Sequence, residues 1–262
     1  MIKRQTRYHV LVAVVGVLVV AMVGSVIGSN MGFKMTRGFT VNANPAAQNA
    51  FIVAFPHHNP YGTLGTDPEG DPSDELLLDW WDSTNQLCIT KYDNAVPGDT
   101  FRCIASIPFP PFYTFSGSPY AFTAGEGYKL EIVSDLAGRV MVGSHDPTFL
   151  QAGPQAYTVS ANPAAKNAFM ISVTPNSKYG NLGTDPEGDP SDELLIDWWD
   201  STNQLCITKY DNAVPGDTFR CIASIPFPPF YTFSGSPYAL TPGEGYWLEI
   251  VADVSRPQSP YY

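Results

Sequence analysis

The sequence predicts an all-β protein made of two tandem Ig-like β-sandwich domains, which arose by internal duplication and follow an N-terminal strand. Residues 38–133 and 156–251 are two copies of the same domain, and they align at an offset of 118 positions without a gap. Between residues 64–121 and 182–239, 57 of 58 positions are identical. Helix signals are scarce, because Pro and Gly recur every few residues and apolar residues alternate or form short β-branched and aromatic runs.

The first repeat shows a regular series of strand signals. We predict strands near residues 39–43, 49–55, 76–82, 86–92, 100–106, 120–123 and 127–133. Short strands at this spacing, separated by turn signals, are typical of a β-sandwich or a closely related barrel. One helical turn is predicted at residues 73–77, with Ser73 or Asp74 as its cap.

The Pro-rich stretch at residues 107–113 interrupts the strand pattern. It cannot be a central strand, because proline donates no hydrogen bond to a neighbouring strand. We predict a polyproline-like crossover that lays Phe109 and Phe112 on the sandwich.

The cysteines occur as one pair in each repeat, at Cys88, Cys103, Cys206 and Cys221. An even count at repeated spacing in an exported chain predicts disulfides. Each pair flanks a turn, at residues 93–99 and 211–217, so we predict a disulfide across two neighbouring antiparallel strands. Metal binding is not predicted here, because the pairs lack the short spacing and the nearby histidines that such sites need.

The first 25 residues have the pattern of a secretory signal peptide, with Lys3, Arg4 and Arg7 before an apolar run and then small residues. An uncleaved membrane anchor is the alternative, because the run is about long enough to span a bilayer. The prediction is a secreted, extracellular or cell-surface protein, which would touch a membrane only through an uncleaved signal.

The charge of the chain is acidic. Loss of Lys3, Arg4 and Arg7 with the signal would change the formal net charge from −11 to −14. A field of this sign repels nucleic acid and anionic lipid and attracts divalent cations. Nucleic acid is therefore excluded as a partner.

The sequence predicts the following division of the chain. It consists of a signal peptide (1–25), an N-terminal donor strand (26–37), a first repeat (38–149) with its completing strand (139–144), a linker (150–155), a second repeat lacking its final strand (156–254), and a tail (255–262).

An acidic loop beginning at Thr66 and repeated from Thr184 is the candidate metal site. Carboxylates this close repel one another unless they are solvated or share a cation, and oxygen ligands on a Gly- and Pro-shaped loop suit calcium. The alternative is a solvated acidic loop. The candidate ligands are Asp67, Glu69, Asp71, Asp74, Glu75, Asp185, Glu187, Asp189, Asp192 and Glu193.

Two Trp pairs, Trp80–Trp81 and Trp198–Trp199, are assigned to predicted strands. One Trp of each pair should then lie in the core while the other points outward. An outward Trp beside carboxylates is a candidate contact for a surface glycan or, more commonly, for a neighbouring subunit.

The sequence does not predict an enzyme. The histidines are His9, His57, His58 and His145, and the most strictly repeated residues contain none of them. Carboxylates such as Asp79 and Asp82 are chemically able to act as acid and base, but no cleft is implied.

The two repeats are not equally complete. After the first, the chain continues into an apolar strand at 139–144, whereas only a short tail follows the second. A matching strand precedes the first repeat, and its residues are Ser25, Val26, Ile27, Gly28, Ser29, Asn30 and Met31. A strand at one end and an empty strand position at the other predict a head-to-tail polymer of copies of the chain.

Short motifs at residues 81–86 and 125–132, repeated at 199–204 and 243–250, resemble a module of secreted bacterial β-proteins. The ends resemble subunits of donor-strand-exchanged filaments, including chaperone–usher pili and helical fibrils from environmental samples. The resemblance implies that the N-terminal strand of one subunit fills the incomplete sandwich of the next. Two tandem domains per subunit depart from the chaperone–usher pattern.

Alternatives to a polymer remain open at this point. The second repeat could be completed by its own tail, giving a monomeric surface-binding module, although Pro257 and Pro260 make that tail a poor strand. An uncleaved N-terminus would give a membrane-tethered adhesin, and an exposed Trp would suit a carbohydrate-binding module.

Overall fold

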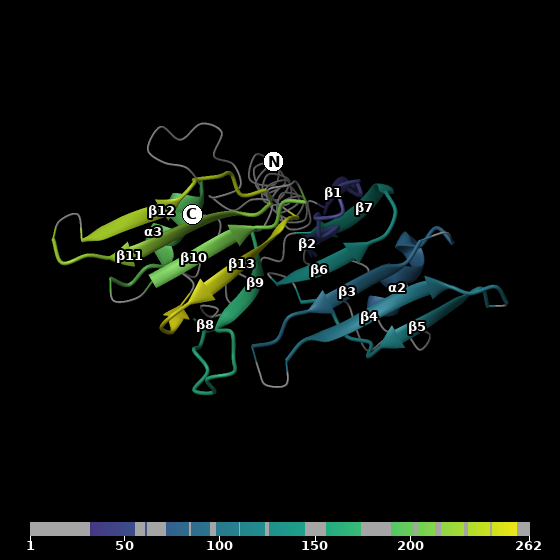
Figure 1. Ribbon diagram of the computed structural model, residues 1–262, viewed down its shortest axis with the longest axis horizontal. Helices are drawn as coiled ribbons and strands as arrows, with labels where there is room; N and C mark the ends of the chain where they lie inside the picture. Colours follow the sequence, from purple (N-terminus) through teal and green to yellow (C-terminus); the bar gives the residue numbers. More distant parts are fainter. Residues whose placement is uncertain are drawn as a thin grey trace, which may run out of the picture.

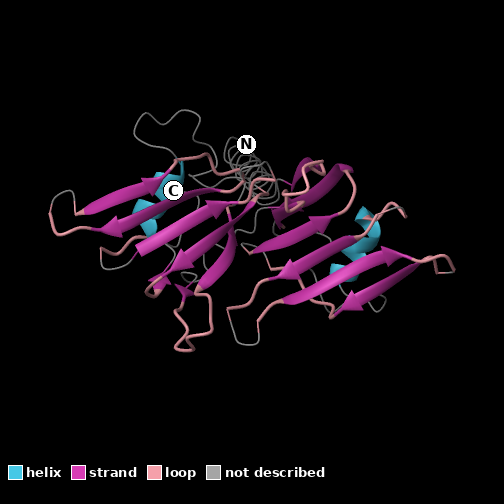
Figure 2. Cartoon of the chain, viewed as in Figure 1, coloured by secondary structure: helices cyan, strands magenta, loops and turns pink. Residues whose placement is uncertain are grey.

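The computed structural model describes residues 32–55, 61, 72–83, 85–94, 98–109, 111–123, 126–144, 156–173, 190–201, 204–212, 216–227, 230–241 and 243–255. The predicted signal peptide, the polymerisation strand Ser25–Met31 and the linker at 150–155 lie outside these residues. The described fold is mostly antiparallel β-sheet with two short helices, as the predicted all-β class requires (Figures 1 and 2).

The first repeat forms a five-stranded antiparallel sheet. Its strands, in spatial order, are β2 (Ala50–Ala54), β6 (Gly127–Ile132), β3 (Leu87–Lys91), β4 (Thr100–Ser106) and β5 (Tyr113–Gly117). Ile89 and Leu130 are opposite one another in register, and both are fully buried with Ile104 on one face. This face carries the hydrophobic core of the repeat.

Helix α2 (Pro72–Trp80) lies where a strand was predicted at residues 76–82. Leu76, Leu77 and Trp80 are buried, a spacing that places all three on one side of a helix against the sheet. Proline suits the first helical position, and acidic residues in the first turn favour the helix dipole. These signals outweigh the strand propensity of the apolar run. The predicted strand at 76–82 was therefore wrong, and the predicted helical turn at 73–77 was too short.

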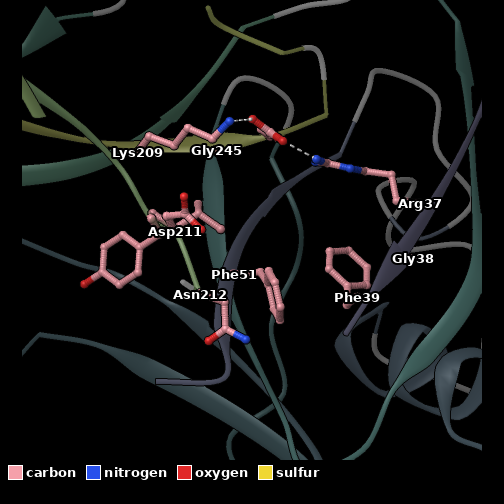
Figure 3. Close-up of a pocket in the computed structure, with 11 residues that line it drawn as sticks. Arg37, Gly38, Phe39, Phe51, Lys209, Asp211, Asn212 and Gly245 are labelled. Atoms are coloured by element: carbon pink, nitrogen blue, oxygen red, sulfur yellow. Dashed lines mark hydrogen bonds and ion pairs between the residues drawn. The ribbon is translucent and has the colours of Figure 1, made fainter. Parts of the chain in front are cut away.

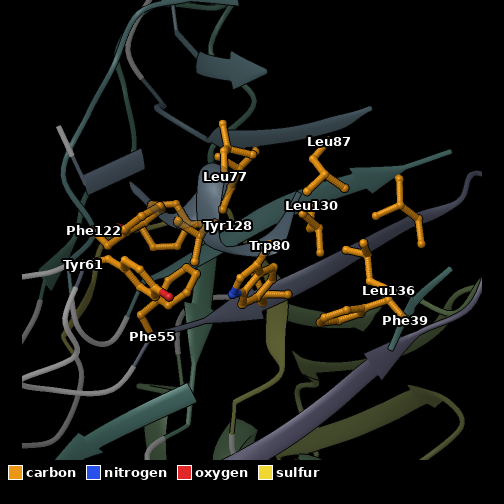
Figure 4. Packing of buried hydrophobic residues seen from close by; sticks show 14 of the residues in the cluster. Phe39, Phe55, Tyr61, Leu77, Trp80, Leu87, Phe122, Tyr128, Leu130 and Leu136 are labelled. Atoms are coloured by element: carbon orange, nitrogen blue, oxygen red, sulfur yellow. The ribbon is translucent and has the colours of Figure 1, made fainter. Parts of the chain in front are cut away.

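A two-stranded ribbon, β1 (Gly32–Phe39) with β7 (Leu136–Ser144), completes the core of the first repeat. Phe39, Leu136 and Met141 are buried in the same cluster as Trp80 (Figure 4). The second layer of the predicted sandwich is thus this ribbon together with α2. The predicted completing strand, 139–144, is the second half of β7.

The second repeat has the same plan. Its sheet contains β9 (Ala168–Ser172), β13 (Gly245–Ile250), β10 (Gln204–Lys209), β11 (Thr218–Ser224) and β12 (Tyr231–Gly235), in that spatial order. Helix α3 (Pro190–Trp198) corresponds to α2. In the described part of this repeat, the ribbon consists of β8 (Ala156–Tyr157) and β14 (Val254–Ser255), whose Tyr157 and Val254 are buried.

The Pro-rich region also differs from prediction. Residues 113–117 form strand β5, which was not predicted, and no strand occupies residues 120–123. The predicted first strand at 39–43 is instead β1, which ends at Phe39. The remaining strand signals agree with β2, β3, β4 and β6 to within one residue at each end.

Candidate functional site

The two predicted disulfides are present. Cys88 lies directly opposite Cys103 on β3 and β4, with Cα atoms 4.0 Å apart, and Cys206 lies opposite Cys221 in the same way. Each bond therefore joins the two strands of one hairpin, as the spacing predicted. Such bonds persist in an oxidising, extracellular environment.

The structure places only part of the candidate calcium site. The ligands that lie outside the described residues are Asp67, Glu69, Asp71, Asp185, Glu187 and Asp189. Asp74 accepts two hydrogen bonds from Arg102, at 2.5 and 2.7 Å, and Asp192 accepts the same pair from Arg220. Each of these two carboxylates thus has an arginine partner in the fold.

Glu75 and Glu193, the remaining candidate ligands, lie in the first turns of α2 and α3. Among the described residues, no group of three or more His, Cys, Asp or Glu side chains is arranged to hold a metal ion. Calcium binding therefore remains a prediction about the loops before the two helices.

The tryptophans are arranged differently from prediction, because they end a helix and do not alternate along a strand. Trp80 and Trp198 are buried in the two cores. Trp81 is half-buried, its indole N–H donates to the carbonyl of Asn85 at 3.0 Å, and its ring packs against Tyr113 at 5.4 Å. Trp199 packs in the same way against Tyr231. Trp81 and Trp199 are thus half-buried beside a tyrosine, and a glycan contact at these residues remains a prediction.

Phenylalanines are exposed in both repeats, at Phe101 and Phe219 (each 49%) and, more fully, in the Pro-rich turn. Phe109 is 73% exposed and Phe112 is 56% exposed, and Phe227 and Phe230 have the same values in the second repeat. The prediction that the first two residues pack on the sandwich was therefore wrong. Apolar character alone suggested burial, whereas the turn leads into β5, the edge strand of the sheet.

The two repeats meet through equivalent surfaces. Val53 forms a bridge with Glu244, and Ile171 forms one with Glu126. Shifting either pair by 118 positions gives the other pair, so the contact is reciprocal. This is the arrangement of a twofold interface, formed here within one chain.

Asparagine side chains form a second reciprocal set of contacts. The backbone N–H of Asn49 donates to Asn212 Oδ1 at 2.7 Å, and Asn212 Nδ2 donates to Asn49 Oδ1 at 3.0 Å. Their equivalents, Asn167 and Asn94, are joined by a hydrogen bond of 3.2 Å. Neutral amides allow two acidic domains to approach without like-charge repulsion.

The centre of the contact depends on two equivalent glycines. A Cβ atom at Gly245 would overlap Cγ2 of Ile52 and lie 3.3 Å from Cα of Gly127. A Cβ atom at Gly127 would lie 2.9 Å from the same Cγ2. Close approach of the two backbones therefore requires the absence of a side chain at both positions.

The contact is asymmetric at its two ends, each of which has a cavity. At one end, a cavity of about 310 Å³ includes Tyr92 and Lys166. The Tyr92 ring packs against Trp247 at 4.4 Å, and Lys166 Nζ lies 4.7 Å from the centre of that ring. At the equivalent positions of the other end the sequence has Lys129 and Gln48, which lack these ring contacts.

The cavity at the other end, about 290 Å³, is shown in Figure 3. Glu244 lies at its edge between Arg37, at 2.5 Å, and Lys209, at 3.3 Å. Burial alone would raise the pKa of Glu244, but the two cations outweigh it and hold the pKa below its ordinary value. Arg37 also donates to the carbonyl of Gly243, so β1 is bound to the second repeat.

Comparisons with known proteins identify no relative, since no family model, curated protein or solved structure matches the chain. Within the described part of the chain, neither helix is long and apolar enough to cross a membrane.

Proposed function

We propose that the chain is a structural subunit of an extracellular filament, in which the N-terminal strand of one copy completes the second repeat of the next. The observation that carries the proposal is the difference between the two ribbons. Among the residues that the structure describes, seven pairs join β1 and β7 in the first repeat, whereas two pairs join β8 and β14 in the second. The five-stranded sheets and the helices are otherwise alike.

The long ribbon contributes to the core of the first repeat. Met141 on β7 is 2% exposed and belongs to the hydrophobic cluster. The offset of 118 positions aligns it with Ser259, which has no apolar side chain to supply. The aligned tail also contains Pro257 and Pro260, which cannot donate backbone hydrogen bonds in a strand. The chain's own tail is therefore a poor substitute for β7.

The described half of the predicted donor strand is used within its own chain. Residues 32–37 lie in β1, so the part available for donation is the stretch before Gly32. Ser25–Met31 precedes β1 at the end of the ribbon where Gly32 pairs with Ser144. We therefore assign donation to Ser25–Met31 alone, and not to the whole of 26–37.

The proposed contact extends without closing. The donor lies at the start of the chain, and the short ribbon β8–β14 belongs to the other repeat. A contact between two different surfaces of identical subunits propagates as a fibre unless its rotation closes a ring. Backbone hydrogen bonds to the edge of the short ribbon would supply the affinity, and apolar side chains such as Ile27 the specificity.

Replacing Ile27 by proline in the secreted, mature protein tests the proposal. Proline removes a backbone donor from the middle of the donated strand, so we expect folded protein whose fibres in negative-stain electron microscopy are shorter than those of the unaltered protein. Ile27→Val is the matched control, because it keeps a β-branched apolar side chain, and it should form fibres as the unaltered protein does.

Fibres of normal length from Ile27→Pro would rule out donation by this strand. Uniform monomers of the unaltered protein would instead favour the surface-binding module as the function.

A further inference from the structure

Each five-stranded sheet has an outer edge strand with a strand neighbour on one side only, among the residues that the structure describes. These are β5 and β12, whereas the opposite edge strands β2 and β9 lie at the contact between the repeats. Figure 1 shows β5 and β12 at opposite ends of the molecule. An open edge presents backbone N–H and C=O groups with which another strand can pair.

A constrained aromatic turn precedes each open edge. In the first repeat, the N–H of Ile107 donates to the carbonyl of Phe112 at 2.9 Å, and the N–H of Phe112 donates to the carbonyl of Phe109 at 2.7 Å. Phe112 has a φ of 68°, a left-handed conformation that is a genuine outlier for a bulky side chain. Such conformations are strained and concentrate at functional sites.

The second repeat reproduces this turn in detail. Phe230 also has a φ of 68°, and the two hydrogen bonds recur from Ile225 and Phe230. Burial cannot explain the strain, because the phenylalanines concerned are more than half exposed in both repeats. Exposed apolar side chains held rigidly at both ends of a molecule are instead suited to a contact.

The charge distribution indicates what the partner is. The chain has a net charge of −11, yet residues 103–125 and 221–243 contain no charged residue. Two copies of an acidic protein repel each other over most of their surfaces but not where these stretches meet. Natural sheet edges are commonly protected from self-pairing by charged side chains, and β5 and β12 have none.

We propose that the outer edges are self-association sites, at which β5 or β12 of one copy pairs with β5 or β12 of another. The phenylalanines of the turns, Phe109, Phe112, Phe227 and Phe230, would pack across this contact. Because the two ends are identical in sequence from residue 107 to residue 117 and from 225 to 235, either end accepts either end. The inference goes beyond the proposed function, since it uses no part of Ser25–Met31.

The test uses sedimentation velocity over a wide range of concentration, with all variants made in mature protein that carries Ile27→Pro, so that strand donation does not contribute. One variant, F109S/F112N, alters one end, and a second variant adds F227S/F230N to alter both ends. Asparagine tolerates a positive φ, so the variants should fold at least as well as the unaltered protein, which thermal unfolding checks. V133S/V251S is the matched control, since these valines are 60% and 63% exposed outside the turns and edge strands.

In the Ile27→Pro background, we expect open-ended oligomers from the protein without further changes and from V133S/V251S. The one-end variant should stop at dimers, because its intact end still pairs with an intact end, and the two-end variant should be monomeric. Self-association of the two-end variant at the level of Ile27→Pro alone would overturn the inference, as would Ile27→Pro protein that stays monomeric.

Ile27→Pro separates this contact from strand donation. The four Phe substitutions are therefore also made in otherwise unaltered protein. If Ile27→Pro abolishes all association while the four Phe substitutions alone leave it normal, the edge contact is wrong and the donor strand stands. If Ile27→Pro associates normally and the four Phe substitutions alone abolish association, the edge contact stands and the donor strand fails.

Discussion

At the scale of single residues, several of the positions at which the two copies differ lie at their contact. The pairs Ile52 and Met170, Val53 and Ile171, and Lys129 and Trp247 are equivalent by sequence but occupy two sides of one asymmetric contact. By contrast, the disulfide hairpin and the aromatic turn lie in the stretch that is nearly identical. At these positions of the contact, the duplicated surface has taken two different roles.

Gly245→Ala should destabilise the contact between the repeats. The added Cβ overlaps Ile52 Cγ2, and backbone lies close behind it, so we expect a loss of about 1–3 kcal/mol in the free energy of unfolding. Urea denaturation measures this loss.

The double variant Gly245→Ala/Ile52→Ala is the matched test of the cause. Removal of Cγ2 frees the space for the new methyl group, so the two losses should sum to more than the loss in the double variant. Strict additivity would mean that Ile52 is not what the new methyl group meets.

At the scale of elements, the sequence predicted correctly those elements whose structure is determined by a local sequence pattern. The hairpin β3–β4 was predictable because a turn and two cysteines fix its register, and Cys88 is indeed opposite Cys103. The full extent of helix α2 was not predictable, because three leucines before two tryptophans also suit a buried strand. Only the packing of Leu76, Leu77 and Trp80 on one side decides between helix and strand.

The candidate site was predicted less well than the fold. Strand β5 follows a Pro-rich stretch that suggests an irregular segment, and its pairing with β4 is a tertiary contact without a local signal. The exposure of Phe109 follows from that pairing. The sequence of a single copy does not predict the reciprocal contact between the repeats, because the contact forms only when residues from different copies, such as Asn49 and Asn212, come together.

The disulfide hairpins should contribute similarly to the two repeats. Each bond closes a loop of 15 residues, for which chain entropy gives about 3 kcal/mol. We expect C88A/C103A to lower the free energy of unfolding of the first repeat by about this amount. Chemical denaturation followed by hydrogen exchange of the amides in each sheet would measure it.

C206A/C221A is the matched control for the second repeat. The first double variant should leave the exchange protection of β10 and β11 unchanged, and the second should leave that of β3 and β4 unchanged. Equal losses in both sheets from either variant would show that the repeats unfold as one cooperative unit.

At the scale of the whole molecule, an element from before the first repeat holds the two repeats together. Arg37 on β1 reaches Glu244 and the carbonyl of Gly243, both immediately before β13 of the second repeat. Strand β1, which begins before the first repeat, thus helps to hold the two repeats in a fixed arrangement. In a filament, β1 would connect the donated segment that precedes it to both repeats of the same subunit.

The contact between the repeats should weaken in acid through Glu244. Its pKa in the folded protein lies below its ordinary value of about 4.5, so the folded state binds the proton less well than the unfolded state. The stabilisation is therefore fully present above the ordinary pKa and is lost as the pH falls through the lower, folded value. We expect Glu244→Gln to reduce the dependence of stability on pH below about 5.

Glu126→Gln is the matched control, because Glu126 occupies the equivalent place, with Lys91 at 3.4 Å, and has Gln155 in place of the arginine at the aligned position. Thermal unfolding of both variants between neutral and acidic pH should show the smaller change for Glu126→Gln, since fewer cations face that carboxylate. If both variants changed the pH dependence equally, the lysines would account for the effect, and Arg37 would hold the repeats together through its hydrogen bond to Gly243 alone. The ion pair of Arg37 with Glu244 would then no longer explain why β1 stays bound to the second repeat.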